Sequence, residues 1–75
     1  MPRTLTITGA SDGVPMYAVL ECTLNLLDSA GVKVDAAAQN IHSDAPATAT
    51  ILLRFADDRS RAIGILERAG IIVQG

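Results

Sequence analysis

Few residues in this sequence could perform chemistry, and they are far apart. Ser11 is the candidate nucleophile, within the stretch "GASDGVPM" that runs from Gly9 to Met16. Nucleophilic catalysis needs a base beside the nucleophile and a third group that orients the base. The only histidine, His42, is expected at the far end of the second predicted strand, too far away to reach Ser11. Because these partners are missing, the sequence argues against an enzyme.

The other reactive side chains have simpler structural explanations. Asp57 and Asp58 lie at the start of a predicted helix, where carboxylates stabilise the N-terminus without any general acid–base role. Cys22 is the only cysteine, so the chain has no internal disulfide and no CxxC or cysteine–histidine metal spacing. Its neighbours suggest a helix, and the simplest interpretation is a buried, inert thiol. The sequence therefore predicts neither a metal site nor a cofactor.

The glycine-containing loop lacks the pattern of a phosphate-binding loop. It has Gly9 and Gly13, but neither the third glycine of GxGxxG nor the Lys-Ser/Thr pair of a Walker motif. Asp12 is expected to cap the following helix, with Pro15 in its first turn. Such a helix N-terminus still offers N–H groups to a carboxylate, and the small loop residues leave space for a small ligand.

Composition limits the classes of function. A chain of 75 residues is one domain, 1–75, and one this small is marginal alone, so oligomerisation or docking would stabilise it. A net charge of −2, scattered basic residues and 3% aromatic residues argue against nucleic-acid binding. No segment has the apolar length of a signal peptide or of a membrane span. A cytoplasmic protein is the expectation.

The apolar pattern predicts a β-α-β-β-α-β order. The expected strands are 4–8, 32–42, 47–55 and 71–75, and the expected helices are 15–30 and 56–70. The first and third strands alternate apolar and polar residues, whereas the helices repeat apolar residues every three or four positions. Gly31 and Gly70 follow the helices, where a residue with positive φ commonly ends a helix.

Two βαβ halves joined by a hairpin predict an α+β, ferredoxin-like sandwich. Its four-stranded antiparallel sheet should have the order 4-1-3-2, with both helices on one face. One face of the second strand should carry Val32, Val34, Ala36 and Ala38. The open face of the sheet should carry Thr4, Thr6, Thr8, Ala37, Gln39, Thr48 and Thr50. This small, uncharged Thr/Ala face is either hydrated or packed on another surface, and both interpretations stay open.

Three stretches carry a family resemblance that covers nearly the whole chain: "TLTITG", "DGVPMYAVLECTLNLLDSAGVKV" and "DDRSRAIGILERAGIIV". In them the chain resembles the ACT domain family, small regulatory modules often attached to enzymes of amino-acid metabolism. "SAGVKV" and "LERAGIIV" match the family patterns at the end of the first helix and at the end of the domain. The chain departs from the family at Met16, where a glycine is usual, and at Lys33, where an asparagine is usual.

The resemblance implies a regulatory module with no catalysis of its own, which forms a homodimer through its second strand. It implies an amino acid or a related small metabolite as effector, bound at the dimer interface, and a partner enzyme of amino-acid metabolism. The implied ligand-binding residues are Ala10, Ser11, Asp12 and Gly13 of one copy, and Val32 and Lys33 of the other. Lys33 would pair with a ligand carboxylate and Asp12 with an ammonium group.

A second hypothesis is a ligand-free interaction module that dimerises and docks on a partner enzyme through the Thr/Ala face. Met16 favours this hypothesis, because the family glycine lets a ligand approach the helix N-terminus closely. Both hypotheses use the second strand, an expected edge whose only charges are Lys33 and Asp35, since a lightly charged edge invites pairing. An enzyme or metal carrier of the same fold is disfavoured, because the loop has no CxxC and Arg3 lies at the wrong end of its strand.

Overall fold

The helices and strands follow the predicted order. A computed structural model of the chain describes residues 2–74, so the expected last strand residue, Gly75, and the first residue of the predicted domain lie outside the described residues. The strands are β1 (Thr4–Ala10), β2 (Val34–Asn40), β3 (Thr48–Leu53) and β4 (Ile71–Gln74). The helices are α1 (Met16–Ser29) and α2 (Arg59–Arg68), the latter preceded by a short 3₁₀ turn, η1 (Ala56–Asp58).

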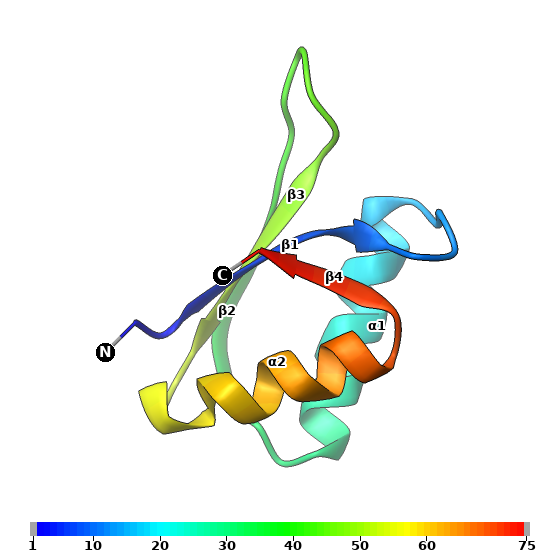
Figure 1. Cartoon of the computed structure of the whole chain (residues 1–75). Coiled ribbons are helices and arrows are strands. Elements are labelled where there is room, and N and C mark those ends of the chain that lie inside the picture. The colour runs from blue at the N-terminus through cyan, green and yellow to red at the C-terminus, as the bar shows by residue number, and fades with distance from the viewer. Residues whose placement is uncertain (1, 75) are drawn as a thin grey trace.

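The four strands form one antiparallel sheet in the order β2-β3-β1-β4. This is the predicted order, written from the other edge. Helix α1 contacts β1, β2 and β3, helix α2 contacts β1 and β4, and the helices contact each other. Both helices lie on the same side of the sheet, and the β2–β3 hairpin projects beyond it (Figure 1). The predicted α+β, ferredoxin-like architecture is confirmed.

The core lies between the sheet and the helices, and the central strands supply much of it. Their inward side chains are fully buried, at 0% exposure: Leu5, Ile7, Ala49, Ile51 and Leu53. Across from them, Val19 and Leu27 of α1 and Ala62 and Leu66 of α2 are buried as well. The alternating sequence of β1 and β3 thus positions one apolar face under the helix layer.

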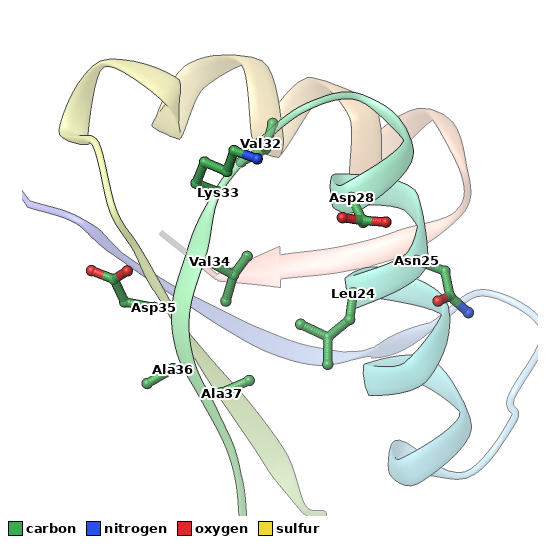
Figure 2. A pocket seen from close by; sticks show the side chains of 9 residues that line it. All are labelled: Leu24, Asn25, Asp28, Val32, Lys33, Val34, Asp35, Ala36 and Ala37. Atoms are coloured by element: carbon green, nitrogen blue, oxygen red, sulfur yellow. The ribbon is translucent and has the colours of Figure 1, made fainter.

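The prediction of which β2 side chains share a face with Val34 is wrong for the residues after Val34. Val34 pairs with Leu53, but Ala36 already pairs with Leu52, so Asp35 is an extra residue in a β-bulge. In Figure 2, Val34 and Ala37 point toward α1, whereas Asp35 and Ala36 point away from it. A one-residue shift exchanges the two faces of a strand, which explains the error.

The open face of the sheet therefore lacks two of the expected residues and gains three others. Ala37 and Gln39 pair with the buried Ile51 and Ala49 and so lie on the helix side, not on the open face. Their place is taken by Ala36, Ala38 and Asn40. The Asn40 amide donates hydrogen bonds to the hydroxyls of Thr48 (3.3 Å) and Thr50 (2.9 Å), so the face remains small and uncharged.

Candidate functional site

The loop after β1 is a tight turn that precedes the helix. The Gly13 N–H donates to the Ala10 carbonyl over 3.1 Å, and the Asp12 Oδ1 accepts the Val14 N–H over 3.3 Å. Helix α1 begins only after Pro15, which is extended (ψ 154°) and provides no side-chain cap. The prediction that Asp12 caps the helix is therefore wrong. Gly13, at φ 74°, and Pro15 are non-helical residues that separate Asp12 from the helix.

This loop is fastened to the opposite end of the chain. The Ser11 N–H donates to the Gly70 carbonyl over 2.8 Å, at the turn between α2 and β4. The Ser11 side chain is exposed, as are Asp12 and Gly13. His42 Nε2 lies 3.3 Å from the Thr48 hydroxyl, so the ring contacts the β3 strand and not Ser11.

The second group of predicted ligand residues, Val32 and Lys33, follows the C-terminal end of α1. The Gly31 N–H donates to the Asp28 carbonyl (3.1 Å) and the Val32 N–H to the Leu27 carbonyl (2.9 Å). These two bonds form a Schellman motif around Gly31, which has the positive φ of 77° that the motif requires. Val32 is 3% exposed, so its side chain belongs to the core and is not available to a ligand.

Within one chain the two groups of predicted ligand residues are far apart. The loop 10–13 precedes α1, whereas Val32 and Lys33 follow it, and the helix has 14 residues. At 1.5 Å per residue, a helix of that length separates its ends by about 21 Å. A single small ligand therefore cannot contact both groups in one copy of the chain.

A groove lies between α1 and β2, beside the second of these groups (Figure 2). Its volume is about 520 Å³, and one wall is the edge strand β2. Its lining residues are Leu24, Asn25, Asp28, Val32, Lys33, Val34, Asp35, Ala36 and Ala37. Sequence reasoning found Val32 and Lys33 but missed Asn25 and Asp28. Their spacing of three on the helix flank was the available signal, because residues three apart share one helix face.

Charges of both signs line this groove. Asp35 forms an ion pair with Arg54, with Asp35 Oδ1 2.8 Å from Arg54 Nε, so its charge is already compensated. Lys33 and Asp28 lie on opposite walls, and Figure 2 shows both side chains at the Val32 end of the groove. Across residues 2–74, neither of these two side chains forms a salt bridge. The groove thus combines a free cation, a free anion and apolar side chains.

Cys22 is exposed, so the prediction of a buried thiol is wrong. The buried residues of α1 are Met16, Val19, Thr23 and Leu27. Successive helix residues are rotated by about 100°, so a residue next to Thr23 in sequence lies on the flank of the buried stripe. Cys22 lines a shallow hollow on the outer surface of α1 instead.

The described residues contain neither a metal-ligand cluster nor a membrane-spanning helix. Within residues 2–74, no group of three or more histidine, cysteine, aspartate or glutamate side chains is arranged to hold a metal ion. In the same part of the chain, no helix has both the length and the apolar character needed to cross a membrane.

The fold is similar to that of a known regulatory protein. It superimposes on the ligand-free regulatory subunit of aspartate kinase from Thermus thermophilus with a TM-score of 0.66, at 17% sequence identity. The match covers 95% of this chain and 47% of the subunit, so the chain spans about half the length of that protein. No protein-family model and no curated protein matches the sequence. At this level of identity the likeness establishes the fold alone.

Proposed function

We propose that the chain is an ACT-like regulatory module that binds an amino acid or a related small metabolite at a dimer interface. It performs no catalysis of its own and acts on a separate enzyme of amino-acid metabolism. The proposed compartment is the cytoplasm, where such enzymes and their free amino acids are found. The fold shared with a regulatory subunit of aspartate kinase supports a regulatory role of this kind.

The observation that carries the proposal is the direction of the edge strand. β2 and β1 are both antiparallel to β3, so β2 runs parallel to β1 and its last residue lies at the end of the sheet where the loop 10–13 begins. In a two-fold dimer paired antiparallel through β2, the start of one β2 meets the end of the other. That arrangement brings Val32 and Lys33 of one copy toward the loop 10–13 of the second copy.

The composition of β2 supports the pairing. Ala36, Ala37 and Ala38 are exposed, and Asp35, the only charge within Val34–Asn40, is held by Arg54. Beyond the bulge at Asp35, the segment 36–40 has no charge and no proline, so this part of the edge is poorly protected against a second strand. The dimer would also bury surface that a domain of this size needs for stability.

The test is a thermal-shift titration against a panel of amino acids, on the wild type and on Asp12→Ala. A ligand at a hundred times its dissociation constant adds about 2.7 kcal/mol of stability. The proposal expects a raised melting temperature with one or two amino acids, and the variant tells whether Asp12 is one of the ligand contacts. A flat response to the whole panel at millimolar concentration would overturn the ligand-binding function.

One observation favours the second candidate, a ligand-free interaction module that docks on a partner enzyme. Met16, at the position of the family glycine, is only 9% exposed, so its side chain fills the space that a glycine would leave. The Thr/Ala face, with Ile72 52% exposed beside it, would be the docking surface. Sedimentation that shows a dimer, together with a flat amino-acid panel, would favour this candidate over the first.

A further inference from the structure

The groove between α1 and β2 holds two opposite charges that the fold does not pair. The other two carboxylates near a basic group are neutralised locally, Asp35 by Arg54 at 2.8 Å and Asp58 by Arg61 at 3.1 Å. Among residues 2–74, Asp28 and Lys33 form no such pair, although they lie on facing walls of one groove (Figure 2). The gap between them is therefore open to a molecule that carries both charges.

Helix stability does not explain Asp28. It lies in the last turn of α1, which contains no basic residue, and the cation at this helix end, Arg61, donates to the Ala30 carbonyl (3.1 Å) and pairs with Asp58 rather than with Asp28. The C-terminal end of a helix carries a partial negative charge, so a carboxylate there is locally unfavourable. A cation placed beside Asp28 would relieve this repulsion, and the position is therefore suited to an ammonium group from a ligand.

The backbone holds both charged residues in place. The Schellman motif fixes the turn from Asp28 to Val32, through hydrogen bonds of 3.1 and 2.9 Å. The backbone N–H of Arg54, which follows β3, donates to the Lys33 carbonyl over 3.0 Å. This hydrogen bond fixes the Lys33 backbone beside the end of β3. Since α1 and β2 are joined by so short a turn, the spacing of the two backbones is fixed before any ligand arrives.

The floor of the groove between the charges is apolar. Leu24 of α1 and Val34 of β2 are partly buried and pack against the core. Both point into the gap in Figure 2, and Ala37 points the same way. An aliphatic or small neutral group would be buried here, whereas a charged group would lose its hydration without gaining a partner.

We propose that this groove binds the zwitterion of an α-amino acid with a small, uncharged side chain. The inference rests on the proposed function and specifies the ligand class and its orientation. The Lys33 ammonium binds the ligand carboxylate, and the Asp28 carboxylate, in place of Asp12, binds the ligand ammonium. The ligand side chain lies on Leu24, Val34 and Ala37.

The first experiment is a calorimetric titration of the wild type with glycine, L-alanine, L-serine, L-threonine, L-valine, L-leucine, L-aspartate and L-lysine. We expect binding of at least one of the uncharged amino acids and weaker binding of the two charged ones. The best amino acid is then compared with two of its analogues. One is the corresponding amine, which lacks the carboxylate, and the other is the corresponding 2-hydroxy acid, which lacks the ammonium group. Each analogue should bind about tenfold more weakly or worse, since each removes one charge-assisted contact.

The second experiment uses Asp28→Asn, with Asp12→Asn for comparison and Asp57→Asn as a matched control. Asp57 is exposed, and it lies in η1, away from the groove. Asp28→Asn should weaken binding of the best amino acid about tenfold and leave binding of its 2-hydroxy acid unchanged. It should not lower the melting temperature of the free protein, because it removes a charge that the helix end disfavours.

The outcomes separate the two levels of the proposal. If no amino acid binds, both the inference and the proposed function are overturned. If an amino acid binds and Asp28→Asn behaves like Asp57→Asn, the inference fails while the proposed function stands. Binding that is lost in Asp12→Asn but kept in Asp28→Asn, or a preference for L-aspartate or L-lysine, would also overturn the inference.

Discussion

The two edges of the sheet are held in different ways. The β4 edge is short, its Ile71 is 4% exposed, and α2 packs against it. It is also tied to the first loop by the hydrogen bond from Ser11 to Gly70. The β2 edge is longer, mostly exposed and bulged, and it borders a groove. The contrast indicates that the β4 edge contributes more to the stability of the domain, whereas the β2 edge is left largely exposed.

Truncation of the β4 edge should have the largest effect. Ile71→Ala removes a buried side chain and should lower the free energy of unfolding by about 2–5 kcal/mol, measured by urea denaturation. Ile72→Ala is the matched control, because its side chain is 52% exposed and points to the other face. The comparison of the edges would fail if Val34→Ala on β2 destabilised the domain as much as Ile71→Ala.

The glycines that end the two helices give the second prediction. Gly31 and Gly70 have φ values of 77° and 83°, so alanine at either position should cost about 1–2 kcal/mol. A Cβ at Gly70 would also lie 2.7 Å from Ser11 Oγ, whereas a Cβ at Gly31 meets nothing within 4 Å. Because Ser11 is exposed and its hydroxyl can rotate away, Gly70→Ala should cost at most about 1 kcal/mol more than Gly31→Ala.

A double-mutant cycle checks the origin of that difference. In a Ser11→Ala background the extra cost of Gly70→Ala should disappear, because the contact with the hydroxyl is gone. If the two glycine variants lowered the free energy of unfolding equally in the wild-type background, the Ser11 hydroxyl would move away from the new Cβ without a measurable penalty.

A charge on the β2 edge tests its availability to a second copy. Ala38→Lys places like charges near each other across an antiparallel β2–β2 pair and should raise the dimer dissociation constant about fivefold. Ser60→Lys, an exposed position on α2, adds the same charge away from the edge and should leave the constant unchanged. Sedimentation velocity over a range of concentrations measures both. A wild type that stays monomeric at millimolar concentration would contradict the proposed pairing.

The ion pair at the bulge should have the smallest effect. The Arg54 and Asp35 side chains are 55% and 33% exposed, so Asp35→Asn should cost less than about 1 kcal/mol. Because the pair is accessible to solvent, the cost should vanish in 1 M NaCl, where screening acts over about 3 Å. The effect of Ile71→Ala should persist in the same salt. If Asp35→Asn lowered the free energy of unfolding equally at low and high salt, Asp35 would stabilise the bulge through hydrogen bonding or packing and not through its charge.

The first central strand was predictable because Leu5 and Ile7 alternate with threonines, and the sheet order followed from the handedness of the two βαβ crossovers. The sequence did not predict the bulge, since the alanine run after Asp35 has no polarity pattern that could reveal a shift of one residue. Asp12 was misassigned because capping propensity carries no information about Gly13 φ. The groove was missed for another reason. Asp28 is a candidate ligand residue only because Lys33 lies on the facing wall of the groove, and the turn at Gly31 determines that placement.

The separation of the loop 10–13 from Val32 and Lys33 by the length of α1 has a consequence for how the proposed module would respond in a cell. If the loop 10–13 of a second copy closes over a ligand held beside Val32 and Lys33, ligand occupancy and association are thermodynamically linked, and each promotes the other. The sensitivity to the effector then depends on how much of the protein is present. A cell could shift the threshold of the response by changing expression alone, with no change in any contact to the ligand.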